Sequence, residues 1–170
     1  MSRVPRLAVS FSGSGHLLIY QLGFARYLLN EPPARAWAAS VCAFAGSSGG
    51  AIAATACALL GADELGDFAD RSIRMGGFNA LLETLRDVHS RDAPLEPPAD
   101  GTLFIGATEC RSGRAALFSR FSNLPPAGSA RTTDETFRSA HHHLGNLSTL
   151  TQCILASCAI PRSAHPFDLL

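Results

Sequence analysis

The first sixty residues twice repeat a short apolar run, a glycine turn and a helical pattern of apolar positions. Residues 7–11 alternate apolar and small side chains and run into the glycine-rich segment 12–15, which predicts a strand and a tight turn. Apolar residues then recur at helical spacing over 17–30. A second strand is predicted at 40–45, and a buried, alanine-rich helix at 51–60.

The rest of the chain continues this alternation with further helices, a hairpin and two polar loops. The expected order is helix 63–75, helix 78–88, loop 89–101, strand 102–108, strand 115–118, loop 122–146 and helix 147–159. Helices alternate with strands, and neither an internal sequence repeat nor a domain linker interrupts the pattern. We therefore expect residues 1–170 to form a single α/β domain of layered helices and strands.

Composition excludes several classes of protein. The 14 basic residues are all arginine, they balance 14 acidic residues, and 46% of the chain is hydrophobic. This composition fits a folded core rather than a disordered chain. Because there is no basic excess, the sequence does not predict binding to nucleic acid. The absence of lysine excludes a phosphate-loop lysine and a Schiff base.

The cysteines and histidines do not predict a metal site. The five cysteines form no C-x-x-C pair, so we expect free thiols in a reducing compartment, no metal and no cofactor. His141, His142 and His143 are consecutive, but no second ligand cluster has matching spacing. We interpret them as part of an exposed polar loop.

The uncharged stretch between Arg35 and Asp63 is long enough to span a membrane. It holds few strongly apolar residues, and a glycine–serine turn lies in its middle. We therefore expect it to belong to the α/β core.

That turn carries the strongest chemical signal of the sequence. Gly46, Ser47, Ser48, Gly49 and Gly50 fit the pattern G-x-S-x-G between a predicted strand and a predicted helix. A nucleophilic serine needs a sharp strand-to-helix turn with small neighbours, and a helix N-terminus favours developing negative charge. Ser48 is therefore the candidate nucleophile, and a purely structural turn is the alternative.

A second candidate is the turn Gly13, Ser14 and Gly15 after the first strand. The dinucleotide-binding pattern G-x-G-x-x-G fails there, because Leu18 occupies the third glycine position. Backbone N–H groups of such a turn could instead form an oxyanion hole, and a plain glycine turn remains the alternative. An α/β-hydrolase is not expected, since its nucleophile follows several strands.

Taken together, the sequence resembles the patatin-like phospholipase family. Three blocks in the family's order carry the resemblance: SFSGSGHLLIYQLG at 10–23, GSSGGA at 46–51 and QCILASCAIP at 152–161. The first block is closest to the branch of adipose triglyceride lipase and adiponutrin. The resemblance implies a three-layer fold, with a central sheet flanked by helices.

The resemblance also implies a Ser–Asp dyad that hydrolyses lipid acyl esters. Ser48 would be the nucleophile, and the backbone at Gly13–Gly15 the oxyanion hole. Triacylglycerol is the first expected substrate and phospholipid the second. The implied location is cytoplasmic, at the surface of a lipid droplet or membrane.

The sequence departs from the family at two places. Leu18 stands where the family has a glycine, and no Asp-Gly step follows Pro161, so Asp168 is not assigned as the dyad base. We interpret residues 1–170 as the N-terminal portion of a longer lipase, with the core motifs in 7–170. The alternative is a catalytically inactive protein that binds lipid or regulates a partner.

Overall fold

A computed structural model describes residues 6–89, 102–108, 113, 115–119, 140–143 and 147–159. Its strands form a five-stranded sheet in the order β1-β2-β3-β4-β5. The strands are β1 (Leu7–Phe11), β2 (Val41–Ser47), β3 (Leu103–Thr108), β4 (Ala115–Ser119) and β5 (Ala140–His143). The helices are α1 (Leu18–Asn30), α2 (Pro32–Ala38), α3 (Gly49–Leu59), α4 (Ala62–Met75), α5 (Gly77–His89) and α6 (Leu147–Cys158), and a 3₁₀ turn (Gly15–Leu17) precedes α1.

The sheet is mixed. β2 pairs in parallel with β1 on one side and with β3 on the other, and the register aligns Phe11 with Gly46 and Ser47 with Gly106. β3 and β4 form the expected antiparallel hairpin, and β5 adds in parallel to β4. Helices alternate with β1, β2 and β3 along the chain, so the predicted α/β class is confirmed.

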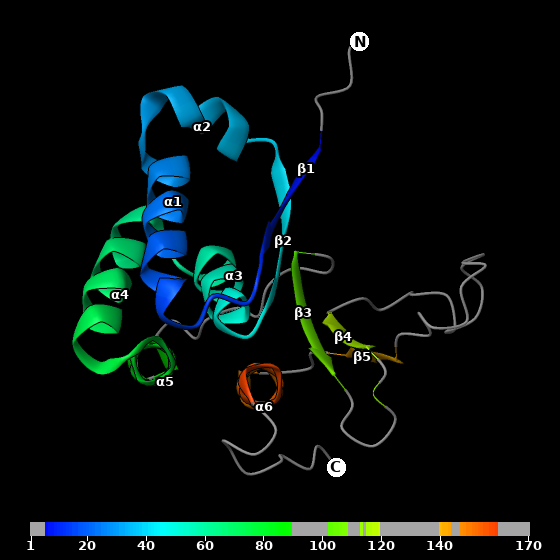
Figure 1. The fold of residues 1–170 in the computed structure, drawn as a ribbon. Helices are drawn as coiled ribbons and strands as arrows, with labels where there is room; N and C mark the ends of the chain where they lie inside the picture. Colours follow the sequence, from blue (N-terminus) through cyan, green and yellow to red (C-terminus); the bar gives the residue numbers. More distant parts are fainter. Residues whose placement is uncertain are drawn as a thin grey trace.

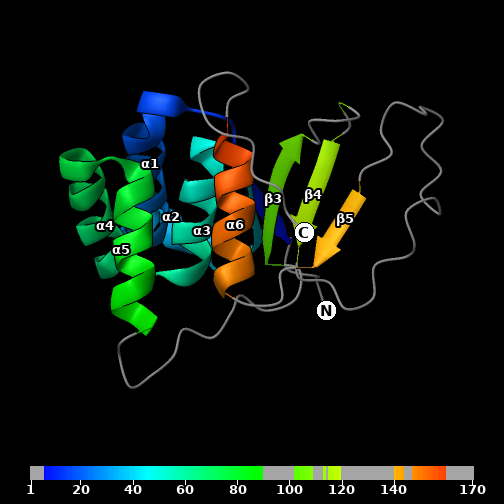
Figure 2. The same cartoon turned by 90° about the horizontal axis from the view of Figure 1, so that it is seen from below.

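The described helices gather on one face of the sheet (Figures 1 and 2). α3 packs along the three parallel strands and α6 lies beside it over β3, while α1, α4 and α5 pack farther from the sheet. Because β1 and β2 are parallel, their carboxyl ends meet at one edge of the sheet, beside the start of α3. This edge holds both candidate turns.

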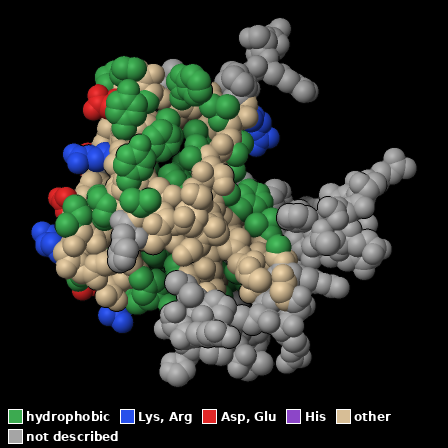
Figure 3. All heavy atoms as spheres, viewed as in Figure 1, with side chains coloured by type: hydrophobic (Ala, Val, Ile, Leu, Met, Phe, Trp, Pro, Cys, Tyr) green, Lys and Arg blue, Asp and Glu red, His purple; other side chains and the backbone are tan. Residues whose placement is uncertain are grey.

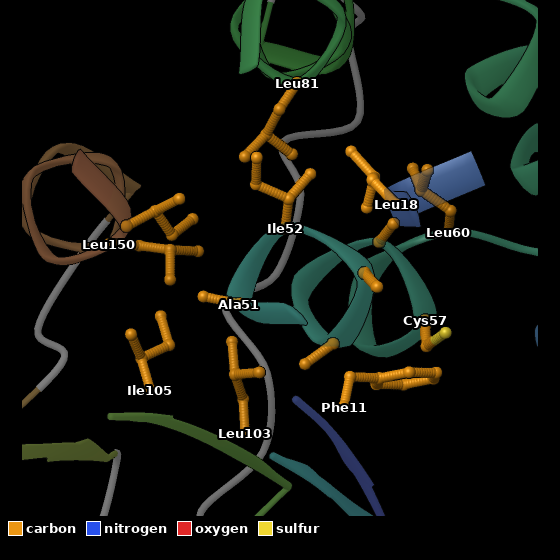
Figure 4. Close-up of a cluster of buried hydrophobic side chains, with 14 of the residues drawn as sticks. Phe11, Leu18, Ala51, Ile52, Cys57, Leu60, Leu81, Leu103, Ile105 and Leu150 are labelled. Carbon is orange, nitrogen blue, oxygen red and sulfur yellow. The ribbon is translucent and has the colours of Figure 1, made fainter. Parts of the chain in front are cut away.

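α3 lies at the centre of the hydrophobic core (Figure 4). Its residues from Gly49 to Cys57 are all buried, which explains why alanine and glycine predominate in a helix surrounded by larger neighbours. Alternate strand residues point toward it, among them Phe11, Leu103 and Ile105. Burial of so many small residues lets the backbone of α3 approach the sheet closely.

Two elements were not expected from the sequence. The helical pattern over 17–30 predicts no further helix before the strand at 40–45, yet Pro32 and Pro33 open α2. Proline fits the first turn of a helix because the N–H groups there have no intrahelical partner. Strand β5 lies within 122–146, where we expected a polar loop, so the three consecutive histidines lie on a sheet strand.

The boundaries at the second glycine turn also differ from the expectation. β2 continues through Gly46 and Ser47, and α3 begins at Gly49, so Ser48 alone separates the strand from the helix.

No helix in the described residues is long and apolar enough to cross a bilayer.

Candidate active site

Ser48 has a strained backbone at the junction between β2 and α3. Its φ of 52° and ψ of −129° make it the one non-glycine residue with positive φ in the described part of the chain. Such a conformation costs a residue with a side chain about 1–3 kcal/mol. The half-buried Ser48 thus sits on the kind of sharp strand-to-helix turn that presents a serine nucleophile.

The glycines around Ser48 are required by close backbone contacts. A Cβ on Gly46 would collide with the carbonyl of Gly50, and a Cβ on Gly50 would collide with the carbonyl of Phe11 and lie 2.5 Å from Ser12 O. These neighbours are backbone atoms that cannot rotate away. The turn is therefore compatible only with glycine at these two positions.

The structure brings the two predicted glycine turns together. A Cβ on Gly49 would lie 2.5 Å from Ser14 Oγ and 3.3 Å from the Gly15 amide nitrogen, and a Cβ on Gly13 would lie 3.7 Å from Ser48 Cβ. Gly15 itself has a φ of +48°. Gly13, Ser14 and Gly15 thus pack against the start of α3, where the first N–H groups of the helix have no intrahelical acceptor.

Two polar side chains fasten these turns, and the sequence did not single them out. Gln21, on α1, donates from Nε2 to Ser12 O at 2.9 Å. Ser157, on α6, accepts a hydrogen bond from the Ser48 N–H at 2.8 Å and donates to Gly106 O at 2.6 Å. Both residues lie within the blocks that resemble the family, but spacing alone gave neither of them a role.

Burial raises the pKa of three thiols on α3 and α6 further above the neutral range. Desolvation raises the pKa of Cys153 and of Cys158, both on α6, to about 11, and the pKa of Cys57, on α3, to about 12. A protonated thiol is a poor nucleophile. These cysteines therefore act as small apolar residues at neutral pH.

No base for Ser48 is identified. Among the side chains that the structure describes, no carboxylate or imidazole hydrogen-bonds to the Ser48 hydroxyl. Asp168, which the sequence left unassigned, lies outside the described residues. The described residues also contain no group of His, Cys, Asp or Glu side chains suited to hold a metal.

Leu18, which departs from the family pattern, is accommodated by a second glycine. Its side chain is buried, and its Cδ2 atom occupies the space that a Cβ on Gly77 would need. The larger residue on α1 is thus matched by the smallest residue at the start of α5. This packing leaves the glycine turn ahead of α1 in contact with α3.

A shallow depression between α4 and α5 contains none of the candidate site residues. It is bordered by Leu60, Glu64, Asp67, Phe68, Arg71, Thr84 and Asp87.

Comparison with known proteins finds no matching family model, no matching curated protein and no matching solved structure.

Proposed function

We propose that this chain is a serine hydrolase of lipid acyl esters, with Ser48 as the acyl-accepting nucleophile. The observation that carries the proposal is the positive φ of Ser48 on the turn between β2 and α3. Strained backbone concentrates at functional sites, where its cost is offset by the geometry it presents. Within the described residues no other side chain combines this strain, partial exposure and nucleophilic chemistry.

The neighbouring backbone supports the second half of the reaction site. Attack of Ser48 Oγ on an acyl carbonyl would place negative charge on the carbonyl oxygen. The turn Gly13–Gly15 and the first N–H groups of α3 lie together beside Ser48, and oriented backbone dipoles of this kind stabilise an oxyanion. Collapse of the oxyanion would break the bond to the alcohol, which takes up the proton lost by the Ser48 hydroxyl, and water would then hydrolyse the acyl-serine ester to the free acid and restore Ser48.

We further propose the patatin-like, three-layer fold for the whole domain. The order strand, glycine turn, helix, strand, serine turn and helix supports it, as does the placement of α6 beside α3. In the described part, helices cover one face of the sheet, and the opposite face carries mainly small residues such as Ala8, Ala43 and Gly106. Small residues there would allow further helices to pack closely.

A lipid surface is the proposed partner, and α1 supports it. Tyr20, Phe24 and Tyr27 on α1 form an exposed apolar stripe with Leu17, which directly precedes the helix, and Tyr20 is 80% and Leu17 68% exposed. Figure 3 shows hydrophobic side chains gathered over α1 and α2. Tyrosine suits a membrane interface because it joins an apolar ring to a polar end.

The apolar stripe begins next to the proposed oxyanion turn. Leu17 follows Gly15 by two residues, so a surface that covered the stripe would lie beside Ser48. The same helix buries Leu18, Leu22, Ala25 and Leu28 on its inner side. Its apolar character on both sides is typical of a helix covered by something other than water. We propose triacylglycerol or phospholipid at the surface of a droplet or membrane.

Labelling with a fluorophosphonate probe tests the hydrolase proposal. We expect labelling of the wild-type chain and of Ser47→Ala, and none of Ser48→Ala. Ser47 is the matched control because it is the adjacent, exposed serine at the end of β2. Labelling that persists in Ser48→Ala would refute the assignment. An unlabelled wild-type chain that still floats with lipid would favour the lipid-binding alternative.

Flotation with phosphatidylcholine vesicles or triacylglycerol emulsions tests the partner. Phe24→Ser lies within the apolar stripe, whereas Ile73→Ser removes an exposed apolar residue from α4. We expect the first variant to lower the lipid-bound fraction severalfold and the second to leave it unchanged. Equal losses in both variants would contradict a role specific to α1.

A further inference from the structure

We propose that Ser157 is the positioning residue of the nucleophile turn: its hydroxyl holds the Ser48 backbone in the conformation that presents Ser48 Oγ. The inference rests on the proposed function for its catalytic meaning. Its structural content, a side chain of α6 that fixes the backbone of Ser48, rests on the two hydrogen bonds of the Ser157 hydroxyl.

The Ser48 N–H needs a partner from outside its own turn. The β2–β3 ladder ends at the pair Ser47 and Gly106. In α3, the helical pattern begins with the Ser48 carbonyl, which accepts from the Ala51 N–H at 2.8 Å. The Ser48 N–H therefore lies outside the hydrogen bonding of both elements. It donates instead to Ser157 Oγ, 109 residues along the chain.

The second hydrogen bond fixes the position of that hydroxyl. Ser157 Oγ donates to the carbonyl oxygen of Gly106, the residue of β3 that pairs with Ser47. One hydroxyl thus links the nucleophile turn, β3 and α6. Accepting and donating at once is a property of serine and threonine that alanine lacks. Without the hydroxyl, the Ser48 N–H and the Gly106 carbonyl each lose this hydrogen bond, and the strained turn loses a restraint.

Amide hydrogen exchange and probe labelling test the inference on the chain 1–170. The variants are Ser157→Ala, Ser157→Thr and the control Gln152→Ala, an exposed position on the same helix. Exchange of the Ser48 amide reports the hydrogen bond without requiring activity. The labelling rate constant and the half-saturating probe concentration, measured separately, report the positioning of Ser48 Oγ.

We expect Ser48 amide exchange at least tenfold faster in Ser157→Ala than in the wild type, and near wild-type exchange in Ser157→Thr and Gln152→Ala. The labelling rate constant should fall at least tenfold in Ser157→Ala, which corresponds to about 1.4 kcal/mol, with little change in half-saturation. Rescue by threonine separates positioning from loss of folding.

Unchanged Ser48 exchange in Ser157→Ala would overturn the inference. So would an equal labelling rate constant in that variant and the wild type. If Ser157→Ala does not fold, protection of the Ser48 amide in the wild type and in Ser157→Thr decides, and an unprotected amide refutes the inference. If the wild type is not labelled at Ser48, the proposed function fails, while the exchange result still decides the role of Ser157.

Discussion

Gly50, in the turn at Ser48, lies against Phe11 and Ser12, which lead into the turn Gly13–Gly15. One methyl group added to Gly50 therefore probes how the two turns pack together. In Gly50→Ala, the Cβ atom would collide with Phe11 O and lie 2.5 Å from Ser12 O and 2.7 Å from the Phe11 carbonyl carbon. Phe11 ends β1 and is aligned with Gly46 of β2, so the sheet restrains these carbonyls. Relief requires movement of the backbone rather than rotation of a side chain.

The expected cost follows from the size of that movement. Relaxed carbon-to-oxygen contacts lie near 3.3 Å, so relief of the closest contact, to Phe11 O, requires a backbone shift of about 1 Å. Overpacking of a core costs about 1–3 kcal/mol, and more where backbone has to move. We expect Gly50→Ala to lower the free energy of unfolding by about 3 kcal/mol, a large share of the roughly 5–15 kcal/mol of a small domain.

Gly23→Ala is the matched control. Gly23 is an exposed residue inside α1, and a Cβ there would meet no atom within 4 Å. Alanine is the better helix former by about 0.5–1 kcal/mol, so this variant should become more stable by that amount. The two glycine-to-alanine changes are thus expected to have opposite signs.

Urea unfolding followed by far-ultraviolet circular dichroism measures both changes. We expect a lower urea midpoint for Gly50→Ala and a higher one for Gly23→Ala, with similar slopes. A Gly50→Ala midpoint at or above that of the wild type would refute the close packing of the turns. If Gly50→Ala is recovered unfolded while Gly23→Ala folds, the expected direction holds.

Three further predictions concern the helices. Burial raises the pKa of Cys57 from its ordinary 9.0 to about 12, so Cys57 should make the free energy of unfolding fall as pH rises from 9 toward 12, by at most about 1.4 kcal/mol per pH unit. Cys153 and Cys158, whose pKa values burial raises to about 11, add to this fall, so urea titrations of Cys57→Ala should show a smaller fall than the wild type, and an equal fall would contradict the prediction. Gly77→Ala should lower the free energy of unfolding by about 1–3 kcal/mol in the wild type, and by much less when it is introduced into Leu18→Ala. Additive losses in the double-mutant cycle would contradict the contact between Leu18 and Gly77. The Arg71–Asp87 pair spans 2.6 Å but is partly exposed, so Arg71→Ala should change the unfolding free energy by less than about 1 kcal/mol at any salt concentration, and a larger loss would be unexpected.

The sequence predicted the elements whose information is local. Apolar periodicity located the helices α3 to α6 and the hairpin of β3 and β4, with boundaries that differ by a few residues. It missed α2 because two prolines indicate the end of a helix as readily as its first turn. It missed β5 because a short strand with polar residues carries no clear alternation, and its place is given by pairing with β4.

The candidate site shows the same division between local and distant information. Ser48 and its glycines could be identified because a sharp strand-to-helix turn requires small residues beside the proposed nucleophile. Ser157 could not, because its contact with Ser48 joins residues 109 positions apart. A serine in an apolar helix has no pattern that distinguishes a solvent-facing hydroxyl from one that hydrogen-bonds to a distant turn.

The glycines of the turn at Ser48 differ in whether the pattern G-x-S-x-G itself contains the contact that requires them. Gly46 is required by the carbonyl of Gly50, four residues away, so the pattern contains both partners of that contact. Gly50 is required by the backbone at the end of β1, which lies outside the pattern, whereas a Cβ on Gly49 would press on the Ser14 hydroxyl, which can rotate. A structural turn that nothing packs against would need only the first glycine. The requirement at Gly50 exists because the two turns pack against each other, which is the arrangement that the proposed oxyanion site beside Ser48 needs.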